Sequence, residues 1–250
     1  PQGTTRTRRR DAPCTRARSA SAGAVTSTRS VRVSSQSSIA VAAGTHASPH
    51  TVAEHTWALI LSALRRIPED ASRMKHGGWR EAFSIGLHGR TLGLYGFGKI
   101  GSLIAATGSS FGMRVLVHGR DSTLQRARAA GCDTTADRRA FFAQSDVLSL
   151  MLRLTAETRG CVTAEDLACM KPDALLVNTA RAELIAPGAL PAALRRGRPG
   201  FAATDVYENE PVLDGDHPLL GLDNALCTAH SAWVEKGTYE LYFGEAFDNL

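Results

Sequence analysis

The chain has 250 residues, 43% of them hydrophobic and 21% charged, so it is long and apolar enough to bury a full core in one large or two small domains. No stretch approaches the ~18 consecutive apolar residues of a transmembrane helix, and the formal net charge of +5 comes from residues 1–38, which hold eight arginines and one acid. The other 21 basic and 23 acidic residues give the rest of the chain a net charge of −2, so we expect neither a membrane nor a nucleic-acid partner.

Residues 1–38 are rich in Arg, Ser and Thr and show no apolar period of 2 or 3.6 residues. Such a segment cannot bury enough apolar surface to offset the entropy of an ordered chain, so the sequence predicts disorder. An organelle transit peptide and a nucleic-acid-binding arm share this composition. A truncated or frameshifted start explains it equally well, because the chain begins at Pro1 and not at a methionine.

The cysteines are scattered and odd in number, and none forms a C-x-x-C pair: they are Cys14, Cys132, Cys161, Cys169 and Cys227. This pattern argues against a disulfide framework and against a zinc site. The sequence therefore predicts a cytoplasmic protein with reduced thiols and no bound metal.

The folded part begins with a predicted amphipathic helix over residues 51–66, which Pro68 either ends or follows by a restart. A loop with glycines is predicted at 75–89. Six short apolar runs then alternate with amphipathic segments, at 91–96, 113–119, 146–152, 174–180, 201–206 and 225–229. Continuous apolar strands that alternate with helices indicate a doubly wound α/β fold, in which helices cover both faces of a parallel sheet.

The first of these runs leads into "GFGKIG", and a predicted helix follows. In a G-x-G-x-x-G loop between strand and helix, Gly96 permits the tight turn, Gly98 lets the backbone approach a pyrophosphate, and Gly101 lets helix and strand pack closely. Lys99 and Ile100 complete this predicted cofactor-binding loop. The alternatives are a tight turn that binds no nucleotide and a methyltransferase-type glycine loop.

The second run ends at Gly119 and Arg120, where an NAD-binding strand usually carries an acid that accepts the ribose hydroxyls. An Arg here can pair with the 2′-phosphate of NADP, because its guanidinium matches phosphate geometry. Asp121 comes one or two positions too late for the usual acid, and with Ser122 it is predicted to cap the next helix. The cofactor is therefore NAD or NADP, and Arg120 favours NADP.

Several stretches together resemble the D-isomer-specific 2-hydroxyacid dehydrogenase family over roughly residues 40–250. "TVAEHTWALILSALRRIPE" is similar to its interdomain helix, and "LHGRTLGLYGFGKIG" to its dinucleotide fingerprint. "ALLVNTARAELI", "AATDVYENEP" and "NALCTAH" follow in the family's order. As a set these motifs are highly specific.

The resemblance implies a catalytic set of Arg181, Glu210 and His230. Arg181 would bind the substrate carboxylate and carbonyl, His230 would exchange a proton with the carbonyl oxygen, and Glu210 would favour the protonated imidazole. Asp205 would hold the nicotinamide carboxamide, with Thr179 and Ala180 also at the cofactor. Each residue has a plainer interpretation as well: His230 as a buried core histidine, Glu210 and Arg181 as surface residues, and Asp205 as a turn residue.

Some positions depart from the family pattern: Ala229 stands where Pro is usual, Glu183 where Gly is frequent, and Met151 and Arg153 where His and Pro are usual. Trp233 is expected to line the pocket.

The resemblance also implies a division of the chain. Residues 39–88 correspond to a remnant of the substrate domain plus the interdomain helix, 89–232 to the dinucleotide-binding domain, and 233–250 to the start of a truncated C-terminal helix. With one wall of the cleft replaced by the Arg/Ser-rich segment, we expect weak cofactor binding and little turnover of a small 2-keto or 2-hydroxy acid. The family's dimers pair through the helix at 51–66, which implies a homodimer whose contacts include Trp57 and Ile60.

Two other functions stay open at this point. One is a dinucleotide-sensing binding module that keeps the fold without turnover. The other, ranked last, is a different glycine-loop enzyme such as a methyltransferase or a short-chain reductase.

Overall fold

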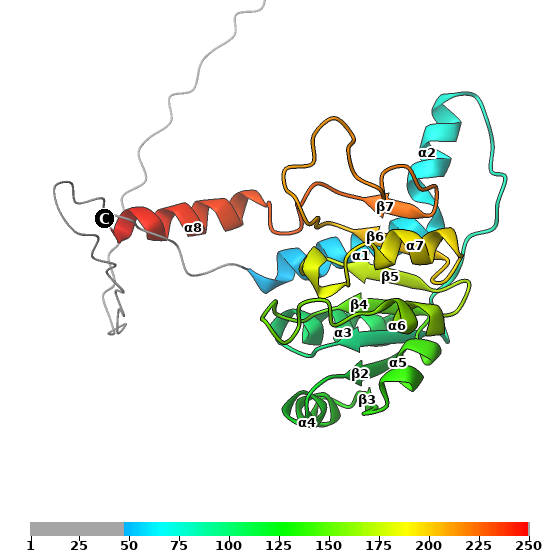
Figure 1. Ribbon diagram of the computed structural model, residues 1–250. Helices are drawn as coiled ribbons and strands as arrows, with labels where there is room; N and C mark the ends of the chain where they lie inside the picture. The colour runs from blue at the N-terminus through cyan, green and yellow to red at the C-terminus, as the bar shows by residue number, and fades with distance from the viewer. Residues whose placement is uncertain (1–47, 250) are drawn as a thin grey trace, which may run out of the picture. The chain divides into compact units, whose positions relative to one another are not determined.

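The structure is a computed structural model that describes residues 48–249 (Figure 1). The segment 1–38, predicted to be disordered, and the first part of 39–88 lie outside the described residues. Within the described part, none of the helices is long and apolar enough to cross a membrane.

The core of the fold is one sheet of seven parallel strands in the order β3-β2-β1-β4-β5-β6-β7. Six of these strands coincide with the six apolar runs, so the predicted doubly wound α/β fold is confirmed. The sequence missed β3, because a strand of two residues has no periodicity to detect. The strands are β1 Thr91–Tyr95, β2 Arg114–His118, β3 Asp133–Thr134, β4 Val147–Leu150, β5 Leu175–Asn178, β6 Phe201–Thr204 and β7 Ala225–Cys227.

The helix predicted at 51–66 is observed at Pro49–Arg65, and Pro68 stands in the first turn of a second helix. The chain breaks between the two at Arg66, whose φ of 56° is left-handed and ends the helical hydrogen-bond ladder. The helices are α1 Pro49–Arg65, α2 Ile67–Lys75, α3 Lys99–Ser110, α4 Asp121–Ala129, α5 Arg138–Gln144, α6 Ala164–Cys169, α7 Ala189–Arg195 and α8 Lys236–Asp248, with a short 3-10 helix η1 at Ala182–Leu184.

Alternate residues of each strand enter separate cores on the two faces of the sheet, as the period of two requires. In β2, Val115 and Val117 belong to the core that contains residues of α1, α3 and α4, whereas Leu116 belongs to the core on the other face, which contains the phenylalanines of α5 and residues of α6 and α7. Because both faces are covered, the five central strands are mostly buried and mostly apolar, with the exposed Arg114 at the start of β2 as an exception.

Trp57 and Ile60 of α1 belong to the chain's own core, which corrects the interpretation of these two residues as dimer contacts. Ile60 is fully buried and Trp57 is 6% exposed, with its ring 5.0 Å from that of Phe111. An amphipathic pattern shows which side of a helix is apolar, but not whether the same chain or a partner covers that side. The exposed side of α1 carries Glu54 and Ala58 instead.

The strand order reverses between β1 and β4, since β1 leads outward to β2 while β4 begins the opposite half. Loops that follow two such strands diverge to opposite faces and leave a crevice at the carboxyl edge, where ligands bind in sheets of this kind. The glycine loop follows β1 at this edge, and the polar residues singled out above follow β5, β6 and β7.

Candidate active site

The glycine loop has the geometry that close backbone approach requires. Gly96 has a φ of 103°, and a Cβ built there would lie 2.6 Å from the carbonyl oxygen of Met151, at the end of β4. A Cβ at Gly98 would meet nothing within 4 Å, so the space above this residue is open. Gly98 is also the N-cap of α3 and provides no side-chain acceptor, which leaves the first N–H groups of the helix available to an anion. These residues fit the pyrophosphate of a dinucleotide.

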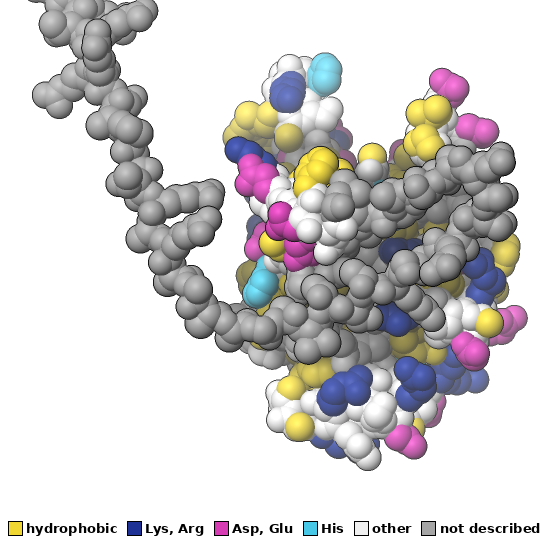
Figure 2. All heavy atoms as spheres, turned by 90° about the vertical axis from the view of Figure 1, so that its left-hand side faces the viewer, with side chains coloured by type: hydrophobic (Ala, Val, Ile, Leu, Met, Phe, Trp, Pro, Cys, Tyr) yellow, Lys and Arg dark blue, Asp and Glu magenta, His cyan; other side chains and the backbone are white. Residues whose placement is uncertain are grey.

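Arg120 follows β2, is exposed, and occupies the N-cap position of α4. The prediction that Asp121 caps this helix is therefore wrong. Asp121 stands inside the first turn and makes no capping hydrogen bond, but its negative charge interacts favourably with the positive end of the helix dipole. Figure 2, which views the side from which α8 extends in Figure 1, shows Lys and Arg side chains at the height of α4. This charge suits a phosphate group.

His230 and Glu210 form a close pair although 20 residues separate them. The imidazole Nδ1 lies 2.6 Å from Glu210 Oε2, and both side chains are 32% exposed. The backbone amide of Tyr207 donates to the other oxygen, Glu210 Oε1, at 2.9 Å. Since the carboxylate occupies Nδ1, the Nε2 atom of the ring is the one that can exchange a proton with another molecule.

The backbone at His230 is strained, with a φ of 48° in the left-handed region. Few residues other than Gly adopt this conformation, and those that do are held there by surrounding contacts. Tyr207 provides one such contact, because its hydroxyl donates to the carbonyl oxygen of Thr228 at 2.8 Å. Burial and the neighbouring Cys227 thiol raise the pKa of Tyr207, so the phenol stays a donor at ordinary pH.

Asp205 is fully buried and holds the loop that carries His230. Its oxygens accept hydrogen bonds from the backbone amides of Ser231 at 2.9 Å and Ala232 at 2.8 Å, and from the Thr228 hydroxyl at 2.5 Å. In this conformation no oxygen of Asp205 is exposed to a nicotinamide carboxamide. The role at the carboxamide that the resemblance implies thus stays a prediction, whereas the contacts with the loop are formed.

Arg181 is exposed and its guanidinium donates to the neighbouring carbonyl of Ala180 at 2.6 Å. Within residues 48–249 no acidic side chain pairs with it, so its charge is available to an anionic ligand. The loop around it is shaped by Asn178, whose amide group donates to Arg181 O and whose Oδ1 accepts from Ala180 N–H. Thr179 is buried and its hydroxyl lies 2.8 Å from that of Thr56 in α1.

The residues of this region that were not singled out from the sequence include His55, Asn178 and Thr228. Asn178 directly precedes the Thr-Ala-Arg segment at a strand end, which is a detectable signal for a residue that shapes the loop. His55 and Thr228 carry no such signal, because their partners are distant in sequence. Trp233, expected to line the pocket, is 40% exposed and stacks on Tyr239 of α8, with ring centroids 5.1 Å apart.

The Tyr-x-x-x-Lys spacing of a short-chain reductase occurs once, at Tyr95 and Lys99. It does not form that enzyme's helical pair here, because Tyr95 ends β1 while Lys99 begins α3. The Tyr95 side chain is buried, packs against Phe141 and Phe142, and accepts a hydrogen bond from Arg138. This arrangement gives Tyr95 a role in the core on the α5 side of the sheet.

Comparison with known proteins decides the family. The model of the family described as "D-isomer specific 2-hydroxyacid dehydrogenase, NAD binding domain" matches residues 57–232. The chain belongs to this family. Among these dehydrogenases, a glyoxylate reductase of Aeropyrum pernix is 39% identical over 195 residues, which are 74% of this chain and 58% of that protein.

Two further members extend the likeness. A D-3-phosphoglycerate dehydrogenase of Methanocaldococcus jannaschii is 37% identical over 202 residues, 80% of this chain and 38% of its own length. The solved structure of a phosphoglycerate oxidoreductase from Vibrio cholerae O395 is 48% identical, with a TM-score of 0.79 over 81% of this chain and 66% of that one. The chain thus spans about 40 to 60% of the length of the two curated relatives and two thirds of the solved structure.

Proposed function

We propose that this chain transfers a hydride between a nicotinamide cofactor and a small 2-keto or 2-hydroxy acid of D configuration. The observation that supports this most strongly is the 2.6 Å contact between His230 and Glu210 in a chain of this family. When bound, the dihydronicotinamide supplies the hydride. The glycine loop and the first N–H groups of α3 would hold its pyrophosphate.

Three side chains of this chain would stabilise the negative charge that develops on the substrate. As the carbonyl carbon accepts a hydride, its oxygen becomes negative, and His230 Nε2–H would donate a proton to it. Glu210, on the opposite nitrogen, orients the ring and stabilises the imidazolium. Arg181 would clamp the carboxylate of the acid and polarise its carbonyl.

The proton transfer is tested by following oxidation of NADH and NADPH with glyoxylate and hydroxypyruvate. The variant His230→Asn keeps a side chain that tolerates a left-handed backbone but removes the proton donor, so kcat should fall by about 10²- to 10⁴-fold. The matched control is His217→Asn, because His217 forms a similar pair with Glu208 at 3.0 Å. Full turnover in His230→Asn would refute the role of His230.

The alternative is a dinucleotide-sensing binding module. It predicts a chain that binds NADH or NADPH yet oxidises neither with either acid, so turnover in the same assay would exclude it. The pairing of His230 with Glu210 supports the enzyme, since a sensor needs no proton donor.

We further propose NADP as the preferred cofactor. The exposed guanidinium of Arg120 at the end of β2 supports this, because it could pair with a 2′-phosphate. Replacement by Asp should weaken NADPH binding at least about tenfold in a fluorescence titration, since a charged hydrogen bond is worth about 1.5–3 kcal/mol. Arg196→Asp, at the C-terminal end of α7, makes the same charge change as a control. If NADH binds better than NADPH and Arg120→Asp changes neither, the NADP preference is wrong.

A homodimer that pairs through α1 is also part of the proposal. Because Trp57 and Ile60 are buried within the chain, the exposed Ala58 is the residue to change. Ala58→Arg should shift the mass measured by light scattering from twice the 26.6 kDa of one chain to that of one chain. A dimer that survives this substitution would place the interface elsewhere.

A further inference from the structure

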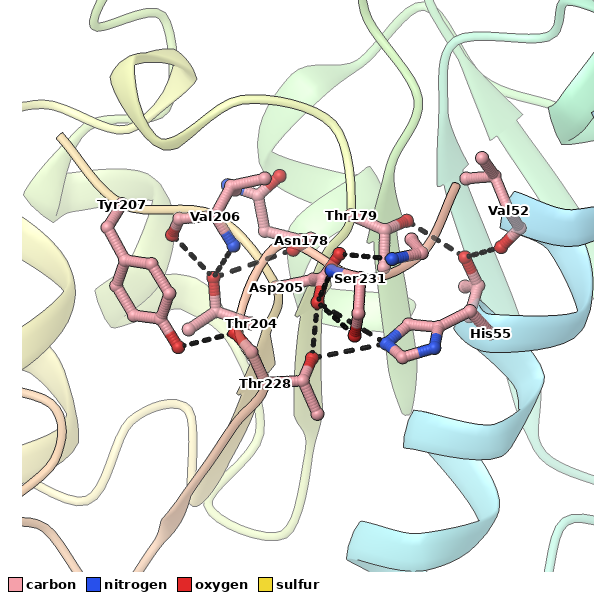
Figure 3. A network of polar contacts seen from close by, with 12 residues as sticks. Val52, His55, Asn178, Thr179, Thr204, Asp205, Val206, Tyr207, Thr228 and Ser231 are labelled. Atoms are coloured by element: carbon pink, nitrogen blue, oxygen red, sulfur yellow. Dashed lines mark hydrogen bonds and ion pairs between the residues drawn. The ribbon is translucent and has the colours of Figure 1, made fainter. Parts of the chain in front are cut away.

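We infer that His55, on α1, is a positioning residue for proton transfer: through Asp205 and Thr228 it fixes the loop that carries His230. This inference rests on the proposed function for its catalytic consequence. Figure 3 shows the network, in which the imidazole of His55 points from α1 toward the carboxylate of Asp205 and the hydroxyl of Thr228.

His55 contacts both groups through one atom. Its Nε2 lies 3.1 Å from Thr228 Oγ1 and 3.4 Å from Asp205 Oδ1, and its side chain is 22% exposed. Thr228 Oγ1 in turn donates to Asp205 Oδ1. The three side chains therefore form a closed triangle between α1, the end of β6 and the end of β7.

Asp205 transmits this contact to His230. Its carboxylate accepts from the amides of Ser231 and Ala232, the two residues that follow the left-handed His230. A fully buried carboxylate keeps its place only while its hydrogen bonds are satisfied. Among residues 48–249, the side chains that reach Asp205 are those of His55, Thr228 and Ser231, and of these only His55 is a basic residue.

The next residue of α1 makes an equivalent contact with the other half of the site. Thr56 Oγ1 lies 2.8 Å from Thr179 Oγ1, and Thr179 begins the loop that leads to Arg181. One turn of α1 thus holds the loop of the proposed carboxylate-binding residue and the loop of the proposed proton donor. We expect the helix to set the spacing between them, because the buried Trp57 and Ile60 anchor α1 in the core beside the sheet.

The other possibility is that His55 only fills space beside the sheet. Two substitutions separate the possibilities. His55→Gln keeps a nitrogen donor the same number of bonds from Cα as His Nε2, and His55→Leu keeps the apolar volume without any donor. His50→Leu, at an exposed position of the same helix, is the matched control.

The first measurement is amide hydrogen exchange at Ser231 and Ala232 in the full chain, without cofactor or substrate. Relative to the amides of β5, His55→Leu should lose at least about tenfold protection at these two sites, whereas His55→Gln and His50→Leu should stay within about threefold of the unsubstituted chain. Unchanged protection in His55→Leu overturns the inference. Equal losses in the Leu and Gln variants do so as well, because they would show that shape and not hydrogen bonding is responsible. If His55→Leu does not fold, Thr228→Val removes the bridging hydroxyl and should give the same local loss.

The second measurement is turnover of the 2-keto acid. His55→Leu should lower kcat about tenfold or more with little change in the dissociation constant of NADPH, and His55→Gln should restore most of it. If even the unsubstituted chain shows no turnover, the proposed function fails while the exchange data still decide the positioning role. Turnover that is equal in all three chains overturns the catalytic consequence.

Discussion

Gly96 and Gly98 lie two residues apart in one loop, and the structure gives them different roles. Replacing each glycine by alanine adds one methyl group and tests the two roles separately. At Gly96 a methyl group meets the Met151 carbonyl oxygen at 2.6 Å on a backbone with a φ of 103°. Such a backbone conformation costs about 1–3 kcal/mol for a residue with a Cβ, and forcing an atom into a packed site adds about 1–3 kcal/mol. In a folded unit of about 200 residues, each 1 kcal/mol lowers Tm by about 2–4 °C, so Gly96→Ala should lose at least about 4 °C.

Gly98→Ala should behave in the opposite way. Its backbone, with a φ of −104° and a ψ of −162°, suits any residue, and the added methyl group points into open space. The free energy of unfolding should therefore change by no more than about 0.5 kcal/mol. If that space is where a pyrophosphate approaches, NAD(P)H binding should weaken at least about tenfold, or about 1.4 kcal/mol.

Thermal unfolding followed by circular dichroism and a fluorescence titration with NADPH measure the two effects on the same samples. A Gly96→Ala variant as stable as the unsubstituted chain would refute the steric reasoning. A Gly98→Ala variant that binds NADPH with unchanged affinity would refute the assignment of the loop to the cofactor.

Three further outcomes are expected. Trp57→Ala and Ile60→Ala should each destabilise the fold by about 2–5 kcal/mol in urea unfolding, and an unchanged midpoint would contradict their burial. Burial of Asp166 favours its neutral form, but hydrogen bonds from Arg138 and from the Thr163 amide outweigh burial and lower the pKa of the carboxyl group. The stability that a lowered carboxyl pKa contributes is lost as the pH falls through the pKa of the folded state. Asp166→Asn should therefore be less stable than the unsubstituted chain near pH 7, and it should lose less further stability between about pH 5 and pH 2. Burial raises the pKa of the Cys161 and Cys227 thiols, so both should react with a disulfide reagent near pH 8 much more slowly in the folded chain than in urea, and equal rates would contradict this.

The sequence was sufficient for those parts of the fold that depend on local pattern. The six longer strands are runs of apolar residues bounded by polar ones, and the glycine loop is a short motif between a strand and a helix. Strand β3 was not predicted because it has only two residues. The N-cap of α4 was placed one position too late, because Arg120 and Asp121 are both compatible with a helix start. Such boundaries depend on backbone geometry that neighbouring side chains do not fix.

The candidate site divides in the same way. His230 and Glu210 were found through the family's motifs, and the structure adds their contact through Nδ1. The role of His55 could not be found from spacing, because its partners Asp205 and Thr228 lie 150 and 173 residues further along the chain and only folding brings them together. Trp57 shows the converse limit: its apolar character was clear from the sequence, but the surface that covers it was not.

The two outermost strands of the sheet have two and three residues, whereas the central strands have four or five. An open sheet exposes unpaired N–H and C=O groups at both edges, and long, flat edges allow strands of other molecules to add. Here both edge strands are so short that a strand from another molecule would find few backbone groups to pair with. The short edge strands, together with the exposed Asp133 of β3 and its ion pair with Arg114, thus protect the sheet against aggregation during expression and storage.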